Sequence, residues 1–171
     1  MLKRSKAISA LIAAGVVVAG ASAAAAQTPK RIGEFTDWGA FSYASPTGKV
    51  CYALSVPTSE APGDVSHGDN FFLVTQRTGQ NVNYEPQFMA GYSLKENSKV
   101  TVDVDGKDFV FFTKANSAWV ENAAQEPALV AAMKAGRSMT VKATSKRGTN
   151  TTYVYSLSGV TAALEAIEGC R

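Results

Sequence analysis

The single histidine of the chain, His67, lies in the sequence Asp-Val-Ser-His-Gly-Asp, with Asp64 and Asp69 on either side. Histidine and carboxylates together can bind a metal ion or form an acid–base centre. A catalytic zinc site needs three protein ligands of defined geometry, and no Gly-x-Ser-x-Gly motif accompanies the histidine. We therefore expect a solvated loop here, with no metal and no cofactor. A hydrolase or metal-dependent enzyme centred on His67 is the alternative function.

The chain contains two cysteines, Cys51 and Cys170. In an exported chain two cysteines allow one intramolecular disulfide, and an oxidising compartment favours it. Neither cysteine has the close cysteine or histidine neighbour that redox and metal sites use. We therefore predict a Cys51–Cys170 bridge, which by the chain-entropy argument contributes about 4–5 kcal/mol for a loop this long.

Aromatic side chains near the middle of the chain are the candidate interaction surface, because exposed aromatic patches often bind peptides or glycans. The alternative is that these rings belong to the hydrophobic core. The candidate residues are Phe71, Phe72, Tyr84, Phe88 and Tyr92. A basic turn at Lys142, Lys146 and Arg147 could contact an acidic partner, although such residues also protect hairpin tips against aggregation.

Residues 1–26 have the pattern of a secretory signal peptide. Lys3, Arg4 and Lys6 precede an uncharged apolar run, and small residues then offer cleavage sites, of which we favour the one after Ala26. The apolar run is too short to span a membrane, and no second run long enough follows. We expect a periplasmic mature protein without a transmembrane segment; peripheral association with the outer membrane and secretion are both compatible with this pattern.

Removal of this segment also removes the excess positive charge. The whole chain has a formal net charge of +3, with 17 Lys and Arg against 14 Asp and Glu. Because the first acidic residue is Glu34, the signal peptide accounts for the whole excess, and residues 27–171 are close to neutral. A neutral domain has no long-range field for nucleic acid, so we expect no nucleic-acid partner.

Residues 27–171 have the size of one domain, without a linker or repeat, and the pattern is mainly β. Alternation predicts strands over residues 35–43 and 50–56, the second with Val50, Tyr52, Leu54 and Val56 on one face. Residues 57–70 read as a long exposed loop. Further strands are expected at 71–77, 87–92, 100–104, 109–113, 119–120, 139–143 and 151–157. A two-residue turn at Asp105-Gly106 joins the strands at 100–104 and 109–113, and Pro86 marks an edge or break.

Two short helices complete the pattern. Pro127 and Gly136 bracket a helix near residues 127–135 that places Leu129, Val130 and Met133 on one face. A second helix is expected near residues 159–168, with Val160, Leu164 and Ile167 on one face and Ser158 as its N-cap. The expected fold is a single-domain antiparallel β-sandwich or partly closed barrel of roughly seven to nine strands.

Three segments resemble the invasion-associated locus B family, and the likeness covers nearly all of the mature chain. They are Phe35-Thr36-Asp37-Trp38-Gly39, Gly48-Lys49-Val50-Cys51-Tyr52-Ala53, and residues 118–164, AWVENAAQEPALVAAMKAGRSMTVKATSKRGTNTTYVYSLSGVTAAL. Many members carry a cysteine soon after the first tryptophan and a further pair near the middle. This chain has Ser42 and no cysteine in residues 107–121, so the family's bridges are not carried over.

The resemblance implies a small exported protein of Gram-negative bacteria, periplasmic or associated with the outer membrane, named for a link to host-cell entry and with no established enzymatic activity. The expected function is therefore non-enzymatic binding of a protein or envelope component through a β-sheet face or edge. A role in host-cell interaction follows from the family name alone.

Overall fold

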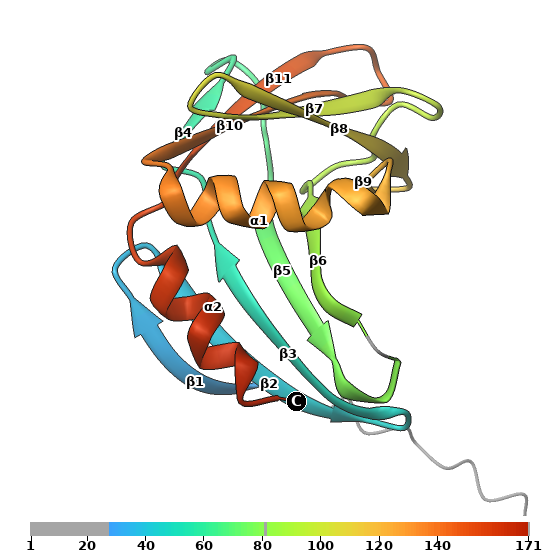
Figure 1. Cartoon of the computed structure of the whole chain (residues 1–171). Coiled ribbons are helices and arrows are strands. Elements are labelled where there is room, and N and C mark those ends of the chain that lie inside the picture. The colour runs from blue at the N-terminus through green and yellow to red at the C-terminus, as the bar shows by residue number, and fades with distance from the viewer. Residues whose placement is uncertain (1–27, 81, 171) are drawn as a thin grey trace, which may run out of the picture.

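A computed structural model describes residues 28–80 and 82–170, so the expected signal peptide at 1–26 lies outside the described residues. Eleven strands form one sheet, and two α-helices pack on it (Figure 1). The strands are β1 (Lys30–Phe35), β2 (Trp38–Ser45), β3 (Gly48–Ser55), β4 (Ser59–Ala61), β5 (Phe71–Arg77), β6 (Val82–Met89), β7 (Lys99–Val104), β8 (Lys107–Lys114), β9 (Ser117–Val120), β10 (Ser138–Thr144) and β11 (Asn150–Ser156).

Every strand pairing in the sheet is antiparallel, in the order β1-β2-β3-β5-β6-β9-β8-β7-β10-β11-β4. The sheet stays open, with β1 and β4 as its edges, and it bends until its two halves face each other (Figure 1). Phe72 and Phe88 on one half reach the rings of Tyr155 and Tyr153 on the other, at centroid distances of 5.9 and 5.5 Å. The predicted mainly antiparallel β class is confirmed.

The expected first strand, at residues 35–43, is two strands joined by a tight turn. Thr36 has φ of 53°, which breaks the extended backbone between β1 and β2. Polar turn residues at 36 and 37 are flanked by aromatic residues on both sides, so alternation continues across the turn and hides it. This split, and the strand β4 inside the expected loop, raise the strand count above seven to nine.

The face of β3 that the sequence groups by alternation is not its most buried face, although Val50 on it is buried. Cys51, Ala53 and Ser55 are buried on the inner face, whereas Tyr52 and Leu54 are half-buried on the outer face. Val56, just past the strand, is exposed. Because the outer face carries its own aromatic pair, Tyr52 stacked on Phe41 at 5.3 Å, hydrophobicity alone does not tell the two faces apart.

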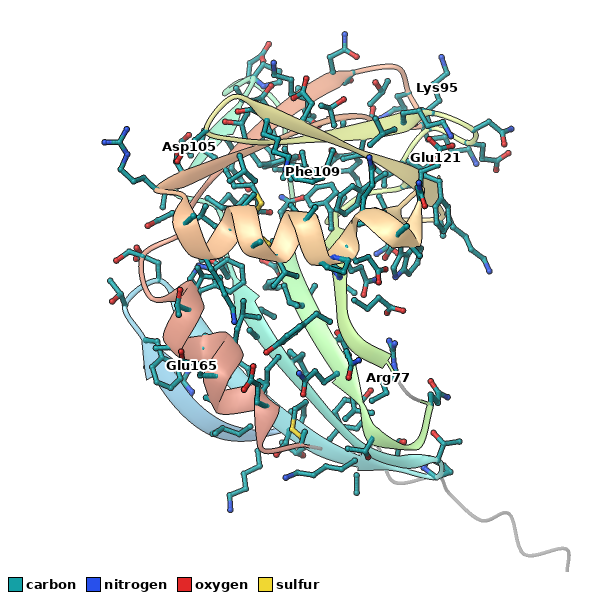
Figure 2. The ribbon with its side chains drawn as sticks, in the orientation of Figure 1. Arg77, Lys95, Asp105, Phe109, Glu121 and Glu165 are labelled. Carbon is teal, nitrogen blue, oxygen red and sulfur yellow. A yellow bond between two sulfur atoms is a disulfide. The ribbon has the colours of Figure 1, made fainter. Side chains whose placement is uncertain are left out.

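The predicted hairpin between β7 and β8 is confirmed. Asp105 and Gly106 have φ values of 47° and 90°, as a two-residue turn with positive φ at both positions requires. Val100, Val102 and Val104 all point into the core. Side chains of the inner face, Phe109 among them, fill the space between these strands and helix α1 (Figure 2).

Both predicted helices are present, α1 at Glu126–Ala135 and α2 at Val160–Glu168. Helix α1 buries Leu129, Val130 and Met133 as expected, and α2 lies over β1, β2 and β3 (Figure 1). The inner face of α2 is apolar and buried at Val160, Leu164 and Ile167. The helices thus close the side of the sheet that the strands leave open.

The expected N-cap of α2, Ser158, is one residue too early. The N-cap is Gly159, which has φ of 91° and makes no side-chain cap. A side chain there would lie 1.9 Å from the carbonyl oxygen of Phe35, so β1 and the start of α2 approach too closely for any residue except glycine. Close packing between the two elements therefore decides this position.

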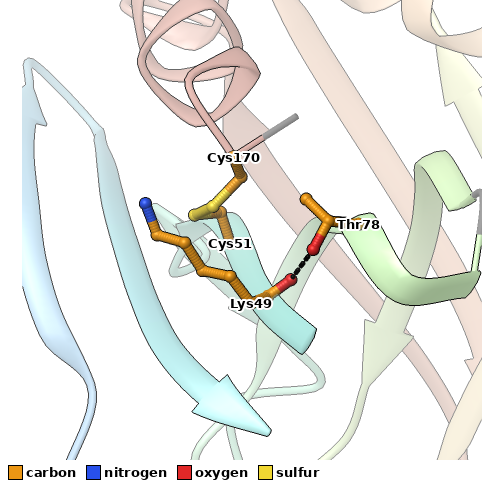
Figure 3. The surroundings of a disulfide bond; sticks show 4 residues. All are labelled: Lys49, Cys51, Thr78 and Cys170. Carbon is orange, nitrogen blue, oxygen red and sulfur yellow. Dashed lines mark hydrogen bonds between the residues drawn. A yellow bond between two sulfur atoms is a disulfide. The ribbon is translucent and has the colours of Figure 1, made fainter. Parts of the chain in front are cut away.

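The Cys51–Cys170 disulfide is present, with the two Cα atoms 6.0 Å apart (Figure 3). Cys51 lies on the inner face of β3, and Cys170 follows the end of α2. Thr78 donates a hydrogen bond to the carbonyl oxygen of Lys49 close by, at 3.1 Å. The bridge fastens the last helix to a central strand.

Candidate functional site

Residues 57–70 are not a simple exposed loop. Ser59–Ala61 forms the edge strand β4 on β11, and further along the segment both His67 and Asn70 are buried. Their exposed fractions are 8% and 2%. The expectation of a solvated loop at His67 is therefore wrong, because this polar stretch folds back under the end of the sheet and meets partners from distant parts of the chain.

Both ring nitrogens of His67 are engaged. Nε2 donates to the carbonyl oxygen of Pro62 at 2.9 Å, and Nδ1 lies 2.9 Å from the hydroxyl of Tyr153 on β11. The two rings meet edge to face, with centroids 5.4 Å apart. The histidine is thus fixed in orientation from both sides.

A line of hydroxyl groups continues from Tyr153 through Tyr92 to Thr151. The Tyr153 hydroxyl donates to that of Tyr92 at 3.1 Å, and Tyr92 lies 2.6 Å from the hydroxyl of Thr151. Thr151 in turn donates to the carbonyl oxygen of Ala143 on β10, at 3.3 Å. Burial and the bond to Tyr92 raise the pKa of Tyr153 far above its usual value, so this hydroxyl stays protonated.

His67, Tyr92 and Thr151 of this line form the inner wall of an open pocket with a volume of about 520 Å³, and Tyr153 joins them from behind. The turn between β10 and β11 forms its outer rim. Backbone hydrogen bonds from Lys146 to Ser93 and from Lys95 to Thr144 hold that turn against the β6–β7 connection. The lining residues are Val65, Ser66, His67, Tyr92, Ser93, Ser145, Lys146, Arg147, Thr149 and Thr151.

The rim is positively charged. Lys146 and Arg147 are both exposed, and neither forms an ion pair with any described residue. Lys142, the third member of the predicted basic turn, pairs with Thr101 and Thr152 along the sheet and does not line the pocket. Two unpaired cations above a wall of hydroxyl groups form a site suited to an anionic group.

Asn70 holds the floor of this site in place. Its side-chain amide donates to Glu60 at 3.0 Å and to the carbonyl oxygens of His67 and Gly68 at 3.3 and 3.1 Å. Its oxygen accepts from the backbone of Gly91 at 3.1 Å. One buried side chain thus joins β4, the His67 loop and the β6–β7 connection.

The five predicted surface aromatics do not form one exposed patch. Phe72 and Phe88 are completely buried between the two halves of the sheet, and so they cannot bind a partner. Phe71 is half-buried on the opposite face of β5. Tyr84 donates to Glu168 of α2, while Tyr92 alone reaches the pocket. Neighbouring residues of a strand point to opposite faces, which separates residues that are adjacent in sequence.

An exposed aromatic pair occurs elsewhere, on the outer face of β8 and β9. Phe112 is 41% exposed and stacks on Trp119, with ring centroids 5.8 Å apart. Sequence reasoning placed neither ring in a candidate surface. Each lies on the outer side of a strand whose inner side also carries apolar residues, and only burial distinguishes the two.

The two aspartates of the alternative enzymatic site do not join His67 in the structure. Asp64 and Asp69 are exposed, and within residues 28–80 and 82–170 no hydrogen bond joins either carboxylate to the histidine. The same residues contain no cluster of three or more histidine, cysteine or acidic side chains suited to a metal. The imidazole instead supports the wall of the pocket.

Sequence reasoning had named several members of the pocket separately. His67 was a candidate acid–base group, Tyr92 one of five aromatics, and Lys146 and Arg147 a basic turn. The structure brings these residues together. Tyr153, Thr151 and Asn70 were missed, since a hydroxyl or amide gives no periodic signal and its partners lie up to 86 residues away.

The described residues define a small all-β domain with one bent antiparallel sheet, two short helices and a basic pocket at one end. The invasion associated locus B (IalB) protein family matches residues 38–168, and the chain belongs to this family. No curated protein matches the sequence. No helix in the described part of the chain is long and apolar enough to cross a membrane.

Among solved structures, the crystal structure of invasion associated protein B from Bartonella henselae is similar to this chain. The TM-score is 0.57 at 12% sequence identity, and the match covers 83% of this chain and 96% of that one. At this identity the likeness shows a shared fold.

Proposed function

We propose that this protein is an exported, non-enzymatic cell-envelope protein of a Gram-negative bacterium that acts by binding a protein or an envelope component. Membership of the invasion associated locus B family supports a shared fold and a shared type of role. The binding site in this proposal is the basic pocket between the His67 loop and the β10–β11 turn.

The observation that carries the proposal is the convergence of distant segments on one open pocket. The His67 loop, the β6–β7 connection and the β10–β11 turn are joined by Asn70, by backbone hydrogen bonds and by the line of hydroxyl groups. These bonds hold the pocket in a fixed shape. Lys146 and Arg147 remain free of ion pairs among the described residues. A preformed pocket with unpaired charges at its rim is typical of a binding site.

The proposed compartment is the periplasm. Its support is the pattern of residues 1–26 and the disulfide between Cys51 and Cys170, because structural disulfides belong to oxidising compartments. Cell fractionation tests this directly. The mature protein should be released with periplasmic contents, with an N-terminus at Gln27; recovery of the uncleaved chain from the cytoplasm would contradict it.

The names of the family and of the Bartonella protein connect both with invasion. We propose that the role in the cell envelope is the general function of the protein. In bacteria that enter host cells, contact with the host cell uses the same pocket. A bacterium that never invades should therefore still need the protein for its envelope. A deletion strain compared with its parent under envelope stress measures this.

Crosslinking in intact cells tests the binding site. We expect the double substitution of Lys146→Glu and Arg147→Glu to abolish the crosslinked partner, since it reverses the charge of the rim. The matched control is Lys49→Glu with Lys114→Glu, which makes the same change of charge at two exposed positions outside the pocket. Equal loss of the partner in both double variants, or in neither, would contradict the proposal.

A further inference from the structure

The wall of the pocket is an unbroken chain of hydrogen bonds that begins and ends at a backbone carbonyl. From the Pro62 oxygen it passes through His67, Tyr153, Tyr92 and Thr151 to the oxygen of Ala143. The five contacts measure 2.9, 2.9, 3.1, 2.6 and 3.3 Å. Carbonyl oxygens only accept hydrogen bonds, so every hydrogen in the chain must come from the four side chains.

When the imidazole is neutral, this hydrogen-bond chain has one hydrogen too few to fill all of its contacts. A neutral histidine supplies one N–H, and the three hydroxyl groups supply one hydrogen each, which makes four hydrogens for five contacts. An imidazolium supplies a second N–H and completes the set. Complete satisfaction of a buried polar chain is favourable, because an unfilled contact between two lone pairs is costly at low dielectric.

One orientation of the hydroxyl groups fills all five contacts. Tyr153 donates to Tyr92, and Thr151 donates to the oxygen of Ala143. With its own hydrogen used in this way, the Tyr153 oxygen is an acceptor for Nδ1 of His67, while Nε2 donates to Pro62. Both ring nitrogens carry hydrogen in this arrangement, which is the one that a bound carboxylate favours.

Each hydrogen of the chain is used within the wall, so a ligand must be held by other donors. Lys146 and Arg147 at the rim supply them, together with the hydroxyl of Ser145, whose oxygen already accepts from the backbone of Thr149 at 3.1 Å. Planar guanidinium and hydroxyl donors suit a carboxylate.

Charged and titratable groups lie on every segment around His67. They are Glu60 from β4, Asp64 and Asp69 from its own loop, Tyr92 from the β6–β7 connection, Lys146 and Arg147 from the β10–β11 turn, and Tyr153 from β11. Glu60 is joined to the loop through Asn70, whose amide donates to the Glu60 carboxylate and to the carbonyl oxygen of His67.

We propose that the pocket binds a carboxylate group and that His67 takes up one proton when it does so. This inference rests on the proposed function, in which the pocket is the binding site. A protonated imidazole behind the pocket and a carboxylate within it attract each other, so each favours the other reciprocally. Affinity should therefore rise as the pH falls, because a lower pH favours uptake of this proton.

The test uses the mature protein with two probes, glucuronate and a glutamate blocked at both ends. Both keep a constant charge above about pH 6, because carboxyl groups titrate near pH 4. Calorimetry at several pH values gives the affinity, and the lone histidine makes its ring resonance in NMR unambiguous. We expect tighter binding at low pH, by at most about tenfold per pH unit for one linked proton.

The substitution Thr151→Val tests whether the missing hydrogen causes the pH dependence of binding. Without this hydroxyl, Pro62, His67, Tyr153 and Tyr92 share three contacts and three hydrogens, so a neutral imidazole satisfies the chain. The pH dependence of binding should then be lost, whatever affinity the variant retains. Thr152→Val is the matched control, since Thr152 is the next residue of β11, half-buried on the outer face and outside the chain. Circular dichroism and urea unfolding establish that both variants fold.

Three results would overturn the inference: no saturable binding of either probe at any pH, binding with equal affinity at all pH values, or the same pH dependence in Thr151→Val as in the wild type. If glucuronate binds and the blocked glutamate does not, the carboxylate comes from a sugar, and the reverse result indicates a peptide. Should crosslinking still depend on Lys146 and Arg147 when neither probe binds, the proposed function stands and this inference fails.

Discussion

At the scale of single residues, Asn70 determines where His67 lies. Its amide makes four hydrogen bonds to three segments that have no other common side chain at this point. Asn70→Ala should lower the free energy of unfolding by about 2–4 kcal/mol, since each lost bond contributes roughly 1 kcal/mol and buried partners are left unsatisfied. Urea unfolding measures the change.

The control for Asn70 is Asn83→Ala on β6. Asn83 is exposed, and the described residues give its side chain no hydrogen bond, so its removal should change stability by less than about 0.5 kcal/mol. The Asn70 variant should also lose carboxylate binding before it loses its fold, because the loop carrying His67 is released first. Unchanged stability in Asn70→Ala would show that the loop is held by other contacts.

The sequence predicted the identities of several pocket residues but not their burial. His67 sits among aspartates, a serine and glycines, and such a composition is normally solvated. What buries it is Tyr153, 86 residues further along, and no local pattern carries that information. Cys51 and Cys170 could be paired from the sequence because two cysteines in an exported chain leave one possible partner each.

At the scale of elements, helix α2 depends on packing. It has nine residues and no side-chain N-cap, so it is too short to be stable alone. Leu164→Ala removes a fully buried side chain facing β1, β2 and β3 and should cost about 2–5 kcal/mol. The variant should lose abundance in the periplasm before it loses partner binding.

Glu165→Ala is the matched control for that prediction, because Glu165 points away from the sheet on the next position of the same helix (Figure 2). Thermal unfolding of both variants gives the comparison. Normal melting of Leu164→Ala together with loss of the crosslinked partner would show instead that this face of α2 contacts the partner.

Helices and strands were predictable where the hydrophobic periodicity agrees with the proline, glycine and aspartate residues that mark helix ends and turns. Pro127 and Gly136 bracket α1, and Asp105 with Gly106 forms the β7–β8 turn, as the sequence indicated. Prediction failed where tertiary contacts override local preference. Gly159 replaces Ser158 as the N-cap because the carbonyl of Phe35 lies against it, and β4 forms only because β11 offers a free edge.

At the scale of the whole molecule, the disulfide closes most of the chain into one loop. Its cysteines are 119 positions apart, and a loop of that length contributes about 4–5 kcal/mol through the unfolded state. Cys51→Ser combined with Cys170→Ser should lower stability by about that amount. Urea unfolding of the double variant and of the oxidised and reduced wild type checks it; a reduced protein as stable as the oxidised one would contradict the prediction.

The contact between the two halves of the sheet gives the molecule its sensitivity to alkali. Burial raises the pKa of both Tyr153 and Tyr155 far above the usual value near 10. The unfolded chain therefore releases these protons first. The stabilising contribution is fully present below about pH 10 and is lost progressively as the pH rises above it.

Tyr155→Phe and Tyr153→Phe separate that pH effect from hydrogen bonding. Among the described residues the Tyr155 hydroxyl is buried without a partner, so its removal should raise the free energy of unfolding by about 1 kcal/mol and shift the alkaline transition to higher pH. Removal of the Tyr153 hydroxyl breaks its bonds to His67 and Tyr92 and should lower stability by about 1–3 kcal/mol at neutral pH. Urea unfolding between pH 7 and about pH 11, followed with tyrosinate absorbance, measures both. If all six tyrosines ionise while the chain stays folded, the two rings do not form the buried contact that holds the halves together.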